Sequence, residues 1–156
     1  MVDEKIKAKI KTLQQLCAAI GPRPRDRKVI MCHGTFDIVH PGHVRHLMYA
    51  KSKADVLVVS LTADAHIAKA NFRPFVPEQL RAMNLAALEM VDHVIIDPEA
   101  KPLKNLSIIQ PDYFAKGYEY VKGGIDRPSR STLMHPIELS EQERSDLVAF
   151  LETLTG

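Results

Sequence analysis

The chain has 156 residues and 46% hydrophobic content, which fits one globular domain with a substantial core. Its 21 basic and 19 acidic side chains leave a formal net charge of only +2, far from the basic excess of nucleic-acid-binding surfaces. Residues 1–11 contain no apolar run of signal-peptide or membrane-span length. We therefore expect a soluble, cytoplasmic protein without a nucleic-acid or membrane partner.

The first 27 residues predict an amphipathic leading helix followed by a linker. Apolar side chains recur at helical spacing until Gly21 and Pro22 end the pattern. These side chains are Ile6, Ile10, Leu13, Leu16, Cys17 and Ile20. Residues 22–28 carry two prolines and four basic side chains, a composition too polar and too broken for a helix or strand.

Residues 28–121 alternate between strand and helix patterns. Four apolar runs predict strands at 29–32, 56–59, 94–96 and 113–115, with helices at about 42–53, 77–90 and 103–109. This alternation predicts an α/β fold, with a Rossmann-like open parallel sheet flanked by helices. Ligands of such sheets bind beyond the carboxyl ends of the strands, so we place the chemistry of this domain there.

Two further helical patterns have apolar faces that we expect to pack against a core. In the helix at 77–90 the predicted inner face is formed by Leu80, Met83, Asn84, Ala87, Leu88 and Val91. Residues 122–156 form an atypical C-terminal segment with a terminal amphipathic helix. A capping box at 140–143 precedes its apolar stripe of Leu147, Val148, Phe150, Leu151 and Leu154.

The segment from His33 to His43 follows the first predicted strand directly and contains two histidines three residues apart. A glycine at position 42 lets a backbone approach a ligand, and the helix that begins there offers amide hydrogens and a positive dipole end. His40 and His43 flank this position, which favours phosphate binding. The alternative is a zinc site, for which His33 or Asp37 is the third ligand nearest in sequence.

This segment resembles the Gly-Thr-Phe-Asp-x-x-His-x-Gly-His signature of the cytidylyltransferase-like nucleotidyltransferase superfamily, matched from Gly34 to His43. Residues 111–120 are similar to the Pro-Asp-x-x-x-Lys-Gly-x-x-Tyr of bacterial heptose-1-phosphate adenylyltransferases, which are often fused behind a sugar-kinase domain. The resemblance implies transfer of AMP or CMP from ATP or CTP to a small phosphorylated acceptor, a sugar or polyol phosphate, with release of pyrophosphate. It also implies Mg²⁺, a homodimer and a possible separate sugar-kinase partner.

The resemblance further implies roles for individual residues. His40 and His43 would hold the triphosphate and stabilise the transition state, while Lys69 and Arg81 would contact phosphate groups. Asp37 would help to place Mg²⁺. The nucleotide-binding set would comprise Gly34, Thr35, Phe36, Asp37, Gly42, Lys116, Gly117 and Tyr118, with hydroxyls from Ser131 and Thr132. For Lys69 and Arg81 the alternative is a solvated charge.

The chain also departs from the family pattern. Ala70 and Asn71 replace the glycine and proline that usually follow the lysine at position 69. The strand and Ser/Thr-rich turn expected after Tyr120 are not recognisable, and residues 122–156 resemble the tail of di-haem cytochrome c peroxidases without any Cys-x-x-Cys-His haem site. An alternative function is therefore a catalytically impaired nucleotide-binding module or a kinase-associated partner.

Overall fold

The computed structural model describes residues 4–67 and 74–116. The elements of these residues are α1 (Glu4–Lys9), α2 (Leu13–Ile20), β1 (Val29–Gly34), α3 (Pro41–Lys51), β2 (Val56–Thr62), the short 3₁₀ helix η1 (Asp64–His66), α4 (Glu78–Ala86), β3 (His93–Asp97), α5 (Leu103–Ile109) and β4 (Tyr113–Ala115). Strands and helices alternate from β1 onward, as the sequence predicts.

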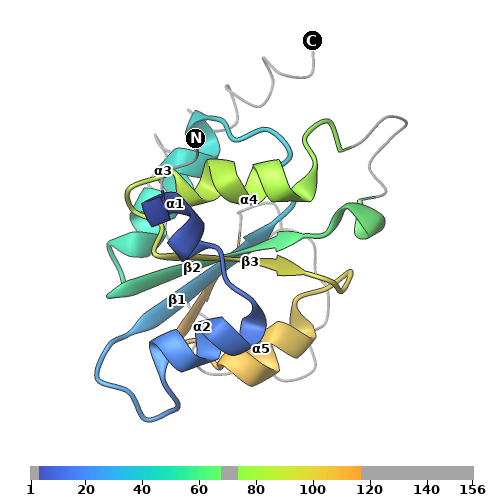
Figure 1. Ribbon diagram of the computed structural model, residues 1–156. Coiled ribbons are helices and arrows are strands. Elements are labelled where there is room, and N and C mark those ends of the chain that lie inside the picture. Colours follow the sequence, from blue (N-terminus) through green and yellow to red (C-terminus); the bar gives the residue numbers. More distant parts are fainter. Residues whose placement is uncertain (1–3, 68–73, 117–156) are drawn as a thin grey trace, which may run out of the picture.

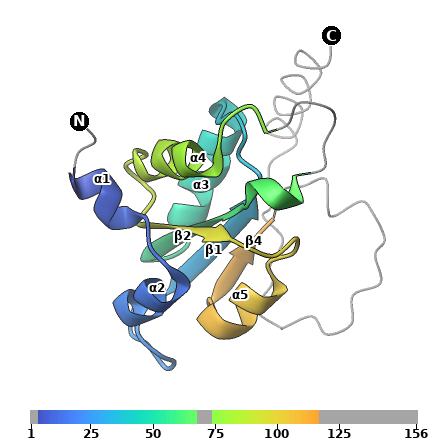
Figure 2. The ribbon, with the colours of Figure 1, turned by 45° about the vertical axis from the view of Figure 1, so that its right-hand side comes forward.

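The four strands form one parallel sheet in the order β3-β2-β1-β4. Helices α1, α3 and α4 cover one face of this sheet, whereas α2 and α5 cover the other (Figures 1 and 2). The prediction of a Rossmann-like open parallel sheet flanked by helices is confirmed. Because all strands run the same way, their carboxyl ends meet at one edge, where the loops after β1, β2 and β3 lie.

Each face of the sheet has its own apolar core. Side chains that alternate along a strand point to opposite faces, so Ile30 and Cys32 pack under α3 and α4 while Val29 and Met31 pack against α2 and α5. The central strand β2 is buried along its whole length. This continuous apolar run is typical of a parallel strand covered on both faces.

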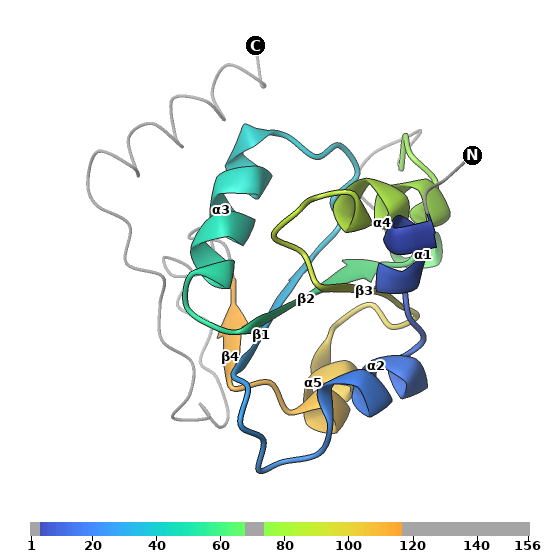
Figure 3. The ribbon, with the colours of Figure 1, turned by 60° about the vertical axis from the view of Figure 1, so that its left-hand side comes forward.

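The leading helix is wrong as a single element, because the chain forms two short helices on opposite faces of the sheet (Figure 3). Between them Ile10 forms a β-bridge with Val94, and the amide of Lys11 donates to the carbonyl of Val94 at 2.9 Å. Thr12 then caps α2. The apolar side chains of α1 therefore pack on one face of the sheet and those of α2 on the other. Leu16 of α2 is fully buried, so both helices contribute to the core of the domain.

The inner face of α4 also differs from the prediction. The structure buries Arg81, Ala82, Leu85 and Ala86, whereas Leu80 is 48% exposed. The helix is rotated because the guanidinium of Arg81 reaches acceptors inside the protein. The predicted terminal helix lies outside the described residues, and no helix among 4–67 and 74–116 has the length and apolar content to cross a bilayer.

Candidate functional site

The loop that follows β1 is shaped by a close packing of Gly34 and Phe36. A Cβ atom on Gly34 would lie 3.1 Å from the ring of Phe36, which is tighter than ordinary van der Waals contact. Phe36 has φ of 50°, in the left-handed region that non-glycine residues rarely adopt. Its buried ring lies 5.1 Å from the ring of His43. The signature residues Gly34 and Phe36 thus set the path of the loop toward α3.

His40 and His43 are stacked at the start of α3. Their ring centroids are 3.8 Å apart with an interplanar angle of 31°, and Nδ1 of His43 accepts from the backbone amide of His40 at 3.4 Å. With Nδ1 as the acceptor, the proton of a neutral His43 is on Nε2. Burial lowers the pKa of His40. The pair therefore places two imidazole rings at the start of α3, where each can donate to a bound anion.

Asp37 joins the motif loop to the segment before α4. Its buried carboxylate accepts the amide of Val76 through Oδ1 at 2.9 Å. One of the two oxygens is thereby engaged in holding the backbone. Within residues 4–67 and 74–116 no group of three His, Cys, Asp or Glu side chains is placed to hold a metal ion.

Arg81 lies inside the protein, and its side chain is 0% exposed. Its Nη1 donates to the carbonyls of Thr35 and Thr62, and its Nε donates to the carbonyl of Val76 at 2.9 Å. Its Nη2 donates to Oδ1 of Asp64. Four of the five N–H groups of Arg81 donate to groups of the protein, an arrangement that favours a positioning role, and its predicted contact with a phosphate stays a prediction.

Asp64 and Glu78 extend this network around the segment between η1 and α4. Oε2 of Glu78 accepts the amide of Asp64 at 2.8 Å, and Oδ2 of Asp64 accepts the amide of Glu78 at 3.2 Å. The start of η1 and the start of α4 are therefore joined by two hydrogen bonds. They are also tied to the motif loop through Arg81 and Thr35.

A second polar cluster at the carboxyl edge was missed by the sequence analysis. His33 is the penultimate residue of β1, Ser60 lies two residues before Thr62 at the end of β2, and Asp97 ends β3. Nδ1 of His33 contacts Oγ of Ser60 at 3.0 Å, and Nε2 contacts Oγ1 of Thr62 at 3.3 Å. The available signal was a polar residue, on the face opposite α3 and α4, near the end of each of three otherwise apolar runs.

The pKa of His33 is lowered, first by burial and then by the positive charge of Lys116, although the carboxylate of Asp97 opposes the shift. The effect of Lys116 places its charge near the end of β1, as expected for the residue that follows β4, the neighbour of β1 in the sheet.

The structure brings most of the predicted residues to one edge. Gly42 is the second residue of α3, between the two stacked histidines, and Thr35 follows β1 directly. Five of the predicted residues lie outside the described part of the chain, namely Lys69, Gly117, Tyr118, Ser131 and Thr132. Their roles stay predictions, as do the domain boundaries at 27 and 121.

Residues 31–147 match the Cytidylyltransferase-like family. The chain belongs to this family. The stretch that matches includes the glycine-bearing loop and the stacked histidines, so the resemblance read from Gly34 to His43 is confirmed.

Several curated relatives of this Cytidylyltransferase-like chain are named Bifunctional protein HldE. The protein from Geobacter metallireducens is 40% identical over 121 residues, covering 76% of this chain and 25% of the relative. That from Geotalea uraniireducens is 36% identical over 148 residues, 93% of this chain and 29% of the relative. The chain thus spans about a quarter of the length of these relatives.

Solved structures of similar fold include the lipopolysaccharide core biosynthesis protein from Thermoplasma volcanium. It has a TM-score of 0.54 and 27% identity, over 81% of this chain and 89% of that one. The pantoate-beta-alanine ligase from Francisella tularensis, with a TM-score of 0.50 and 19% identity, covers 68% of this chain and 55% of its own. The second likeness concerns the fold alone.

Proposed function

We propose that this chain is a nucleotidyltransferase that transfers AMP or CMP from a nucleoside triphosphate to a sugar or polyol phosphate. The observation that carries the proposal is the stacked pair of His40 and His43 at the first turn of α3, directly after β1. Family membership supports it, because the matched region contains this pair.

The reaction needs placed reactants more than covalent work by the protein. An oxygen of the acceptor phosphate forms a bond to the α-phosphorus of the nucleotide. The bond from that phosphorus to the bridging oxygen breaks, and pyrophosphate leaves with the electron pair. The Nε2 proton of His43 and the imidazole of His40 donate to phosphate oxygens on which negative charge builds, beside the positive end of the α3 dipole.

Asp37 fits a magnesium ligand in part, because one carboxylate oxygen accepts the amide of Val76. A carboxylate is a hard oxygen ligand of the kind that magnesium binds, and magnesium commonly takes its other ligands from water and from the phosphates of the nucleotide. When bound, Mg²⁺ neutralises charge on the phosphate oxygens. Asp37 itself holds the motif loop against the segment that precedes α4, through its hydrogen bond with the amide of Val76.

ATP is the nucleotide that we favour, because residues 111–120 resemble the adenylyltransferase pattern. A homodimer and a separate sugar-kinase partner stay part of the proposal. The full-length relatives are named bifunctional and are about four times as long as the matched region.

The proposal is tested by pyrophosphate release from the purified chain with Mg²⁺, using ATP or CTP and a panel of sugar and polyol phosphates. Replacing His43 with Ala should lower turnover about a hundredfold, as the loss of one transition-state donor typically does. His46→Ala, one turn further along α3, is the matched control and should keep most of the activity. Equal turnover of the His43 variant and the wild type would rule out the mechanism.

A second outcome is that no acceptor of the panel gives pyrophosphate release. Nucleotide binding by calorimetry without pyrophosphate release for any acceptor would favour the alternative of a nucleotide-binding module. In that case His43→Ala should weaken nucleotide binding instead of turnover.

A further inference from the structure

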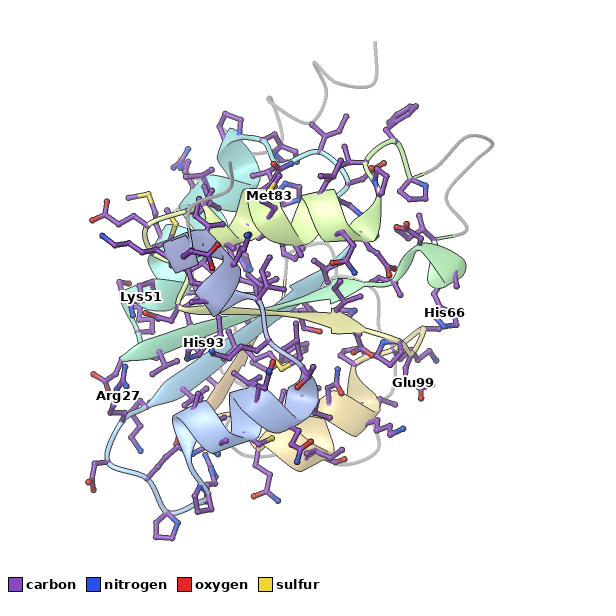
Figure 4. The ribbon with its side chains drawn as sticks, viewed as in Figure 1. Arg27, Lys51, His66, Met83, His93 and Glu99 are labelled. Carbon is purple, nitrogen blue, oxygen red and sulfur yellow. The ribbon has the colours of Figure 1, made fainter. Side chains whose placement is uncertain are left out.

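The carboxyl edge of the sheet has two halves. The proposed nucleotide-binding residues follow β1 and β4, which are neighbours in the sheet, whereas β2 and β3 form the other half. Figure 4 shows His66 and Glu99 together at this edge, beyond the ends of β2 and β3, and His93 toward the opposite edge. If the nucleotide lies over β1 and β4, the second reactant lies over the β1–β2–β3 ends, where the His33 cluster is found.

The Nδ1 atom of His33 lies near polar groups of β2 and β3. Oγ of Ser60 lies 3.0 Å from Nδ1, and Oδ2 of Asp97 lies 4.0 Å away. Asp97 is 0% exposed, and its other oxygen accepts the amide of Glu99 at 2.9 Å. Oδ2 of Asp97 has no hydrogen-bond partner among the described residues. A buried carboxylate beside Nδ1 favours the proton on that nitrogen and leaves Nε2 with its lone pair.

The Nε2 atom is held more loosely. Oγ1 of Thr62 lies 3.3 Å from Nε2 and also 3.5 Å from the carbonyl oxygen of Gly34, both long contacts. The single hydroxyl proton of Thr62 can serve only one of these acceptors at a time. The side chain of His33 is 10% exposed, at the carboxyl edge of the sheet.

We propose that Nε2 of His33 accepts a hydrogen bond from a hydroxyl group of the acceptor, so that His33 selects polyhydroxylated phosphate esters. Asp97 is the positioning residue that acts through Nδ1. This inference rests on the proposed function and names the group that reads the acceptor.

The chemistry of the cluster favours a hydroxyl over a phosphate at this position. A lone pair on a neutral imidazole recognises a proton donor, and an ionised phosphate has none to offer. The buried negative charge of Asp97, 4.0 Å from the ring, also repels an anion. The acceptor would therefore place its phosphate toward the stacked histidines and its hydroxyl groups toward His33.

Calorimetry on the full chain tests this, in the presence of a non-hydrolysable ATP or CTP analogue. The probes are glucose 1-phosphate, ribose 5-phosphate and glycerol 3-phosphate, each compared with propyl phosphate, which keeps the ester but has no hydroxyl. At least one hydroxylated probe should bind the wild type about tenfold more tightly than propyl phosphate. His33→Ala should remove this preference and leave the affinity for the nucleotide analogue unchanged.

His93→Gln is the matched control, since His93 is a half-buried histidine at the amino end of β3, away from the carboxyl edge. It should keep the preference, while His33→Gln, whose amide oxygen can accept a hydrogen bond, should keep part of it. Retention of the full preference in His33→Ala overturns the inference. So does an absence of binding by all three hydroxylated probes, even where pyrophosphate release with another acceptor supports the proposed reaction.

Side-chain ¹⁵N NMR gives a reading that is independent of any variant's folding. The wild type should show the Nδ1-protonated tautomer of His33, and Asp97→Asn, which preserves shape, should shift the tautomer population toward Nε2. A hydroxylated probe should move the Nε2 resonance, and propyl phosphate should not. A dominant Nε2-protonated form in the wild type contradicts the inference. Hydroxyl preference without pyrophosphate release would instead contradict only the proposed function.

Discussion

Arg81 shows how a single charged residue can organise a site from inside the protein. Its guanidinium binds carbonyls at the ends of β1 and β2, the carbonyl that precedes α4, and the carboxylate of Asp64. The planar fork of an arginine matches several acceptors at fixed angles, which a lysine ammonium cannot do from one position. The relative placement of the motif loop and the β2 loop therefore depends on this side chain.

Arg81→Lys should lower the free energy of unfolding by about 3 kcal/mol, because buried carbonyls lose their donors while the positive charge stays inside. Denaturant unfolding measures the loss. Arg45→Lys on the exposed side of α3 is the control and should change stability by less than about 0.5 kcal/mol. A wild-type midpoint for Arg81→Lys would show that the network of Arg81 contributes little.

At the scale of elements, the break between α1 and α2 is set by one cap and one bridge. The hydroxyl of Thr12 accepts the amide of Gln15 at 3.2 Å, and the Gln15 side chain accepts the amide of Thr12 at 2.9 Å. This capping box starts α2 at a position where the Ile10 bridge has already turned the chain across the edge of β3. The two helices can then cover opposite faces.

Thr12→Ala should cost about 1 kcal/mol of stability, the usual loss when an N-cap hydroxyl is removed. Thermal unfolding followed by circular dichroism measures it. Thr12→Ser keeps the hydroxyl and should unfold close to the wild-type temperature. Equal loss in both variants would mean that the methyl group of Thr12, and not the cap, carries the effect.

At the scale of the whole molecule, partly buried histidines link stability to pH. The pKa values of His33, His40 and His93 are all lowered, with burial as the first cause in each case. In the unfolded chain these groups titrate near a pKa of about 6.5. Below that pH the unfolded state binds more protons than the folded state, so the free energy of unfolding falls as pH falls.

Stability should therefore decrease from about pH 6.5 downward, which urea unfolding at a series of pH values measures. His93→Gln should make the decrease shallower.

Asp112 acts at lower pH: burial raises its pKa, but the amide of Val29 and the charges of Arg23, Lys28 and Arg25 outweigh burial and lower it. Its contribution is present above a pKa of about 3.9 and is lost below it. A flat profile between pH 7 and 5 would contradict the histidine linkage.

The sequence by itself determined the elements and the motif. The helix at 103–109 and the strand at 113–115 have the predicted bounds, and the apolar runs at 29–32 and 56–59 lie within β1 and β2. These features depend on residues that are neighbours along the chain. The glycine and histidine spacing from 34 to 43 is equally local, so the candidate phosphate site could be placed after the first strand.

Tertiary structure alone decided which face of α4 is buried, where the leading helix breaks and how the His33 cluster forms. Arg81 turns inward because its acceptors include the carbonyl of Thr35, 46 positions earlier in the chain. His33 and Asp97 meet because two crossovers bring the ends of β1 and β3 to the same edge. The periodicity of a sequence reports on near neighbours, whereas burial of a polar group depends on partners that only the folded sheet assembles.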